Sequence, residues 1–144
     1  MTTKNLSLRS CAEKVEHLVY FGRMLDKIRA HDRGELPEDY VPNLGKGFDG
    51  RCVRFLGLEY EDLVARVKQG GTDEEILDWA FVAGREPSEE ETEIWNEFMR
   101  KCGWNDDVTE VVERRKKEGG FADRDDIQTM FNFIDADEGR EPAK

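Results

Sequence analysis

The chain has 144 residues, of which 38% are hydrophobic and 38% charged, and its formal net charge is −11. This length is typical of one domain with one core, and eight Phe, three Trp and three Tyr residues argue against global disorder. No apolar run approaches the roughly 18 residues that span a bilayer, and the polar start lacks the apolar block of a secretory signal. We therefore expect a soluble, cytoplasmic protein that does not span a membrane.

The charge is distributed unevenly along the chain. Residues 1–58 carry ten Lys/Arg and eight Asp/Glu, whereas residues 59–144 carry twelve and twenty-five. The acidic second half disfavours nucleic acid and anionic membrane as partners, so a surface that attracts an anion should belong to the first half. The three cysteines are widely spaced and form no Cys-x-x-Cys motif, which favours reduced thiols. We expect no metal site and no cofactor.

The first predicted helix covers residues 11–31. Ser10 and Glu13 have the spacing of a capping box, and apolar residues then recur on one face of the helix. Arg29 falls within that apolar face, where a guanidinium needs a partner. Asp26 is the nearest candidate on the helix surface, and a ligand pocket is the alternative.

A long ordered loop is predicted for residues 34–48, because prolines and glycines keep this segment out of regular structure. Tyr40 and Leu44 should anchor it to the core. Asp49 is then expected to cap a short helix that ends at Gly57, since no second strand is available to pair with a strand at this place.

The remaining helices are predicted from apolar periodicity and from caps, which are capping boxes at Thr72–Glu75 and Ser88–Glu91 and a cap at Asp123. They cover residues 59–69, 72–84, 88–103, 105–118 and 123–137, and we expect their apolar stripes, including Ile94 and Phe98, to form the core. The predicted fold is an all-α, single-domain globular bundle of about six to seven helices. Residues 1–137 form the domain and residues 138–144 a flexible tail.

Several stretches resemble a known group of bacterial proteins, domain-of-unknown-function family 5069. The similarity covers nearly the whole chain and is carried by Leu8–Ser10, Phe21–His31, Gly34–Tyr40, Asn43–Gly57, Gly70–Glu75 and Ile127–Asp137. The resemblance implies a bacterial, stand-alone cytosolic protein and fits an all-helical fold. It implies no activity, ligand or catalytic residue.

The segment 45–50 has the Gly-x-Gly-x-x-Gly spacing of a dinucleotide fingerprint. That motif has its meaning only after a strand in a βαβ unit, so we reject a Rossmann fold here. A glycine-rich turn before a helix can still bind an anion through backbone N–H groups and nearby cations. The candidate ligand residues are Arg29, Gly45, Lys46, Gly47, Arg51 and Arg54, and Arg23, Lys27 and Arg33 could complete the pocket. The alternative is a structural turn whose glycines allow close helix approach.

A cysteine nucleophile is the second possibility. Cys52 is expected in the first turn of a helix beside Arg51, where dipole and cation stabilise a thiolate. Because a nucleophile needs a base, the residues to test are His31, Asp32 and Cys52. The alternative is a small buried cysteine with a packing role.

Three functions are compatible with these patterns. The first is a small cytosolic binding or regulatory module that engages an anionic small molecule or an acidic protein patch. The second is a small enzyme acting on an anionic metabolite. The third is a structural or protein-interaction protein with no small ligand, and the patterns do not predict the oligomeric state.

Overall fold

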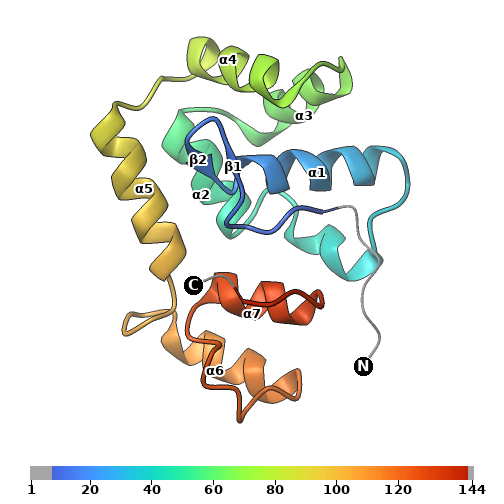
Figure 1. The fold of residues 1–144 in the computed structure, drawn as a ribbon. Helices are drawn as coiled ribbons and strands as arrows, with labels where there is room; N and C mark the ends of the chain where they lie inside the picture. The colour runs from blue at the N-terminus through green and yellow to red at the C-terminus, as the bar shows by residue number, and fades with distance from the viewer. Residues whose placement is uncertain (1–7, 143–144) are drawn as a thin grey trace.

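The computed structural model describes residues 8–142 and is almost entirely helical (Figure 1). This confirms the predicted all-α fold. The described part contains seven α-helices, one 3-10 helix (η1) and one short hairpin. Their bounds are β1 Lys14–Val15, β2 Leu18–Val19, α1 Phe21–Asp32, η1 Glu38–Asn43, α2 Phe48–Leu56, α3 Tyr60–Lys68, α4 Asp73–Ala83, α5 Glu89–Lys101, α6 Thr109–Glu118 and α7 Met130–Asp137.

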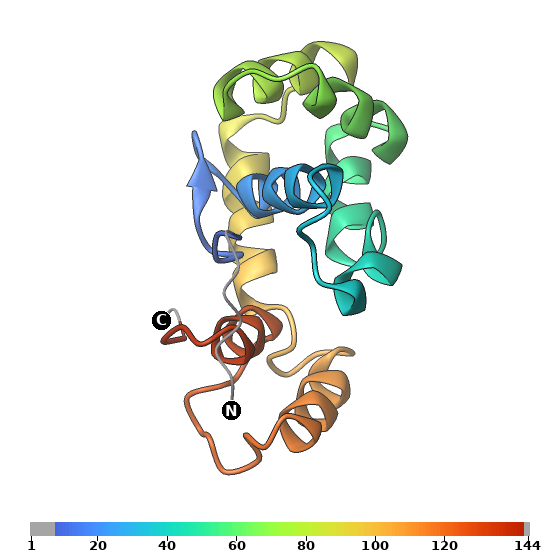
Figure 2. The same ribbon diagram turned by 90° about the vertical axis from the view of Figure 1, so that its right-hand side faces the viewer.

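The helices are stacked in three layers. Helices α3 and α4 lie at the top of Figure 1, α1, α2 and the hairpin in the middle, and α6 and α7 at the bottom. Helix α5 runs along the side of the molecule and connects the top layer to the bottom one, as the turned view in Figure 2 also shows. It contacts both β2 and α7, so it holds the layers together.

The first helix is shorter than predicted, because residues 14–19 form an antiparallel hairpin with Lys14 opposite Val19. The hairpin is stabilised by a distant element. Asn96 on α5 accepts a hydrogen bond from Val19 N at 3.0 Å and donates one to His17 O at 2.6 Å. These bonds satisfy backbone groups that a lone two-stranded hairpin would leave unpaired, which local periodicity could not reveal.

The main core lies between α1, α2, α3, α4, α5 and α7. Its largest fully buried apolar side chains include Phe21, Met24, Leu25, Leu56, Leu63, Ile76, Leu77, Met99 and Phe131. Tyr40 and Leu44 pack against a smaller cluster of Leu8, Ala30 and Leu36, which confirms the expected anchoring of the 34–48 segment. That segment is not wholly irregular, because it contains η1.

The predicted capping boxes of α4 and α5 are confirmed. In each box, the hydroxyl of the cap residue, Thr72 or Ser88, accepts a hydrogen bond from the backbone N–H of the glutamate three residues later. The side chain of that glutamate accepts a hydrogen bond from the backbone N–H of the cap residue. The start of the last helix was predicted wrongly. It begins at Met130 and is capped by Thr129, not by Asp123.

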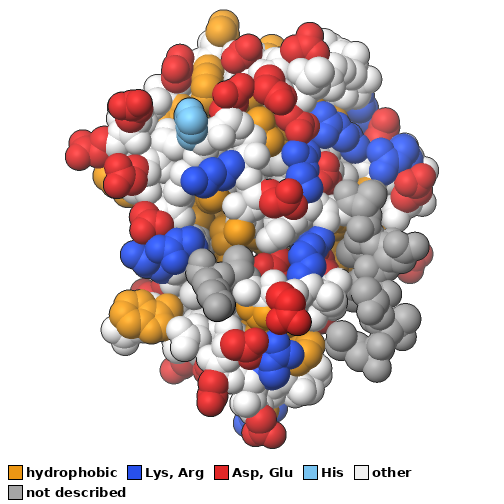
Figure 3. All heavy atoms as spheres, in the orientation of Figure 1, with side chains coloured by type: hydrophobic (Ala, Val, Ile, Leu, Met, Phe, Trp, Pro, Cys, Tyr) orange, Lys and Arg blue, Asp and Glu red, His pale blue; other side chains and the backbone are white. Residues whose placement is uncertain are grey.

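On the face shown in Figure 3, acidic side chains are scattered over the surface with Lys and Arg interspersed. Two residues expected in the core belong to this surface instead, since Ile94 is 62% exposed and Phe98 44% exposed. No helix within residues 8–142 has the length and apolar character needed to cross a membrane.

Candidate functional site

A pocket of about 320 Å³ lies where the middle layer meets α6 and α7. Its wall combines aromatic and aliphatic side chains with charged groups of both signs. The lining residues are Tyr20, Arg23, Lys27, Asp39, Tyr40, Asn43, Lys46, Gly47, Phe48, Val108, Arg115, Met130, Phe133, Ile134, Asp137 and Glu138. Four of them are cations, in a chain whose formal net charge is −11.

Tyr20 and Lys27 of the pocket wall form a buried triad with Asp49, which does not itself line the pocket. The Asp49 carboxylate is 0% exposed, accepts from Tyr20 Oη at 2.6 Å and lies 2.8 Å from Lys27 Nζ. Lys27 also donates to Tyr20 Oη at 3.0 Å. Burial, and then the charge of Asp49, raise the pKa of Tyr20 well above its ordinary value, so the phenol stays protonated and acts as a donor.

Tyr20 occupies a backbone conformation that bulky residues rarely adopt, with φ 75° and ψ −30°. Two features keep it there. Its ring packs edge-to-face on Phe48 at 5.7 Å and stacks on Phe131 at 6.4 Å, and its hydroxyl is bonded within the triad. The strained residue is thus held by α2 and α7, the two helices that meet at the pocket.

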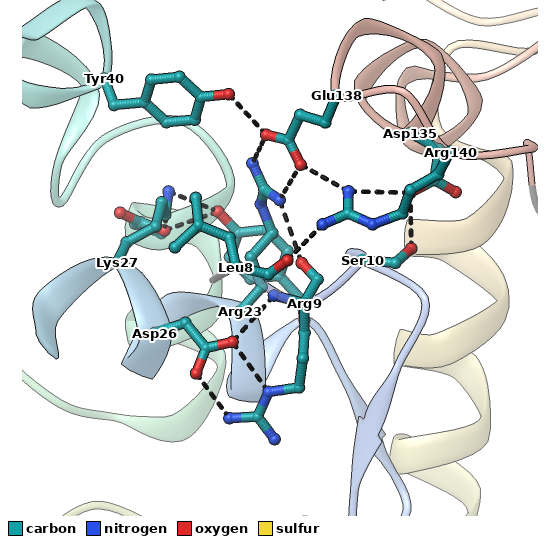
Figure 4. A network of polar contacts seen from close by, with 12 residues as sticks. Leu8, Arg9, Ser10, Arg23, Asp26, Lys27, Tyr40, Asp135, Glu138 and Arg140 are labelled. Atoms are coloured by element: carbon teal, nitrogen blue, oxygen red, sulfur yellow. Dashed lines mark hydrogen bonds and ion pairs between the residues drawn. The ribbon is translucent and has the colours of Figure 1, made fainter. Parts of the chain in front are cut away.

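A second charged cluster surrounds Glu138 (Figure 4), and its members Arg23, Tyr40 and Glu138 line the pocket. Arg23 donates to both carboxylate oxygens, Nη1 to Oε1 at 2.8 Å and Nη2 to Oε2 at 2.7 Å. Tyr40 Oη donates to Oε2 at 2.7 Å, and Arg140 Nη1 donates to Oε1 at 2.6 Å. Glu138 and Arg140, which the sequence assigned to a flexible tail, are held in place by these contacts.

The environment of Glu138 favours its charged form. Burial alone would raise its pKa, but the hydrogen bonds and charge of Arg23, followed by the donors Tyr40 and Arg140, outweigh burial and lower the pKa to about 2. The cluster therefore stays ionised at neutral pH. Arg140 also contacts the Leu8 carbonyl oxygen. Because Arg140 and Arg23 of α1 both bind Glu138, these contacts connect both ends of the described chain to α1.

Only part of the predicted anion site lines this pocket. Lys46 and Gly47 do, together with Arg23 and Lys27 from α1. Gly45 has a structural role: its N–H donates to Asp49 at 3.1 Å, its φ is 76°, and a Cβ there would lie 2.8 Å from the Tyr60 ring.

The other predicted ligand cations point elsewhere. The Arg29 guanidinium lies 2.8 Å from Asp73 and 3.8 Å from Asp26, so it is part of an internal ion-pair network. Arg51 stacks over the Phe98 ring at 4.9 Å. Neither these two arginines nor Arg54 lines the pocket.

The candidate catalytic residues are not brought together. His31 and Asp32 are exposed at the end of α1, where Asp32 lies 3.9 Å from Lys68. Cys52 is fully buried, and burial followed by the charge of Asp49 raises the pKa of its thiol, which disfavours a reactive thiolate. Among residues 8–142, no group of three or more His, Cys, Asp or Glu side chains is arranged to hold a metal ion.

Of the sixteen lining residues, sequence reasoning named only Arg23, Lys27, Lys46 and Gly47 as possible ligand residues. Tyr40 was expected only as an anchor to the core and Glu138 as part of a tail, and Arg115 was not singled out. A signal for Glu138 existed in retrospect: Arg23 and Lys27 lie four residues apart on one face of α1, so two buried cations needed carboxylate partners.

Comparison with curated proteins gives no match. Residues 5–140 match the model of the family described as a domain of unknown function (DUF5069). This match spans nearly the whole sequence, and the chain therefore belongs to the DUF5069 family.

Proposed function

We propose that this protein is a small binding module whose pocket takes a small organic anion with an apolar body. The observation that carries the proposal is the placement of cations. The pocket is lined by four cations, Arg23, Lys27, Lys46 and Arg115, and three carboxylates, Asp39, Asp137 and Glu138, although acidic residues outnumber basic ones in the chain by 33 to 22.

Two of these cations are available to a ligand. Arg23 and Lys27 are neutralised by Glu138 and Asp49. Lys46 and Arg115 are exposed, and no ion pair involves either of them within residues 8–142. They come from two different elements, the segment before α2 and helix α6, and both line the pocket, so both could bind the charged group of one anion.

The rest of the wall suits an apolar group. Phe48, Met130, Phe133 and Ile134 line the pocket beside the cations. Its volume of about 320 Å³ is at the lower end of the range for small-molecule sites. A ligand of this class would place its apolar body against α7 and its charged group between Lys46 and Arg115.

A thermal-shift and calorimetric screen tests the proposal. Benzoate and phenyl phosphate serve as anionic probes, benzamide as the neutral analogue, and inorganic phosphate as the charged group without a body. A bound probe should stabilise the fold by about 2.7 kcal/mol at a hundredfold excess over Kd. Equal shifts with benzamide, or no shift with any anion, would contradict the proposal.

Matched substitutions locate the site. Lys46→Ala and Arg115→Ala should each weaken probe binding about tenfold, the loss expected for one charge-assisted hydrogen bond. Arg54→Ala and Lys117→Ala remove exposed cations from the same two regions of the chain outside the pocket, and should leave the affinity unchanged. Equal losses of affinity in the pocket variants and in the control variants would mean that anion binding depends only on the overall charge of the protein.

The enzyme alternative has no comparable support, because His31 and Asp32 are exposed at the end of α1, Cys52 is buried, and none of the three lines the pocket. We also propose a cytoplasmic location in a bacterium. The family resemblance supports it, and the free, buried state of Cys11, Cys52 and Cys102 fits a reducing compartment.

A further inference from the structure

Lys27 is a pocket residue whose hydrogen-bonding capacity the fold does not use completely. It lines the pocket although only 8% of the residue is exposed. Its ammonium group has three N–H donors. Nζ donates to Tyr20 Oη at 3.0 Å and lies 2.8 Å from Asp49 Oδ1, and no further acceptor is bonded to it among residues 8–142. One N–H of a nearly buried charge is therefore left for a group in the pocket.

A ligand that fills the pocket has to supply an acceptor to this N–H of Lys27. In an open pocket such a donor is hydrated by solvent, and a ligand displaces that solvent when it binds. A buried donor that is left without an acceptor is costly. A site of this kind therefore favours a ligand that has an acceptor at the right place over an equally large ligand that lacks one.

The groups around Lys27 select a neutral acceptor. Asp49 is completely buried and already balances the charge of Lys27, so a second carboxylate at Nζ would lie beside a like charge without net attraction. The Tyr20 hydroxyl donates its proton to Asp49. A ligand hydroxyl would bring another proton that needs an acceptor, whereas a carbonyl oxygen only accepts. A carbonyl is thus the group that suits the remaining N–H.

We infer that the ligand of this pocket is an anion whose apolar body also carries a ketone, aldehyde or amide carbonyl, and that Lys27 donates to this carbonyl oxygen. The inference rests on the proposed function, because it assigns a second contact of the same ligand. Lys46 and Arg115 bind the charged group, and Lys27 determines which apolar bodies are accepted. The ion pair with Asp49 and the bond to Tyr20 hold the Lys27 ammonium in place for this contact.

Calorimetry with isosteric probes and the full chain tests the inference. Meta- and para-acetylbenzoate carry a carbonyl, and meta- and para-isopropenylbenzoate have nearly the same shape and the same charge without one. At least one acetyl isomer should bind about tenfold more tightly than its isopropenyl counterpart, the gain expected for one hydrogen bond to a charged group. If neither acetyl isomer binds more tightly while benzoate itself binds, the inference is wrong and the proposed function stands. If no benzoate binds at all, both fail.

The carbonyl of the bound probe also reports its partner. Its infrared stretching frequency, isolated by isotope labelling of the acetyl carbonyl, should be lower in the complex than in water, because a charged donor in a water-poor pocket polarises the C=O bond more strongly than water does. A frequency higher than in water would place the carbonyl against apolar side chains and would overturn the inference. This measurement needs no variant.

Substitution of the donor completes the test. Lys27→Met should abolish the preference for the acetyl over the isopropenyl probe. Because this variant leaves Asp49 buried without its cation, Lys27→Met combined with Asp49→Asn replaces it if circular dichroism melting shows that it does not fold. Lys116→Met is the matched control, since Lys116 is also buried, at 5% exposed, but does not line the pocket, and the preference should persist in it. An acetyl preference that survives in the Lys27 variants, or is lost equally in Lys116→Met, would contradict the assignment of Lys27.

Discussion

At the scale of single residues, Asp49 is the group on which the local structure depends most. It lies in the first turn of α2 and is completely buried, where it accepts hydrogen bonds from Tyr20 Oη and Gly45 N and faces Lys27. The carboxylate and its three partners stabilise the fold only together, because removing one of them leaves a buried charge or polar group without a partner.

Replacing Asp49 by Ala should therefore destabilise the protein by about 3–5 kcal/mol, since the Lys27 charge is left buried without a partner. Urea unfolding measures this change. Combining Asp49→Ala with Lys27→Met removes both charges, and the double variant should be more stable than the sum of the single losses predicts. Strict additivity in this cycle would show that the two side chains do not interact.

At the scale of elements, the hairpin and α5 form one unit. Trp95 Nε1 donates to Val19 O at 3.2 Å, and Asn96 bonds to Val19 N and His17 O, so two consecutive residues of a helix satisfy the backbone of a hairpin about 77 residues earlier. The hairpin needs this support because two strands alone are marginally stable in water.

The substitution Asn96→Ala should cost about 1–3 kcal/mol, because the buried Val19 N–H loses its acceptor. It should also speed hydrogen exchange at that amide. Glu93→Ala on the exposed side of the same helix is the control, with an expected change within about 0.5 kcal/mol. A protected Val19 amide in the Asn96 variant would argue against this role.

At the scale of the whole molecule, Glu138 connects the C-terminal segment to α1 and η1. Its carboxylate accepts from Arg23 and Tyr40, which precede it by 115 and 98 residues. These contacts help to hold the segment after α7 against α1 and η1, at the edge of the pocket that Glu138 lines.

Stability should accordingly fall in acid. The pKa of Glu138 is lowered from 4.5 to about 2 in the folded protein, so the unfolded chain binds the proton first as the pH falls. The contribution of the cluster is complete above about pH 5 and is lost progressively between pH 4.5 and 2, by up to about 3 kcal/mol. Unfolding measured from pH 7 to pH 2 should show this loss, and Glu138→Gln should flatten it.

Glu97 provides the control for this loss of stability in acid. Its hydrogen bond from Arg100 also lowers its pKa to about 2, but the pair lies at the surface and is screened by solvent. Glu97→Gln should leave the pH profile nearly unchanged at physiological salt. If both variants flatten the profile equally, burial of Glu138 is not the deciding factor.

The sequence by itself determined the features whose partners are close along the chain. The caps at Thr72 and Ser88 and the left-handed Gly57 that ends α2 follow from contacts within about five residues, and they were predicted correctly. The helical content follows in the same way, because apolar periodicity and capping act locally. Two residues that line the pocket, Lys46 and Gly47, were also named from the glycine-rich turn before α2.

Only the tertiary structure decided the hairpin, the ion-pair clusters and the pocket. The residues that stabilise them come from parts of the chain that are far apart in sequence, such as Asn96 for Val19 and Glu138 for Arg23. Local patterns favoured helix at residues 11–20 and a free tail after residue 137. Burial reversed both preferences, because backbone groups and charges removed from water require partners wherever the fold can supply them.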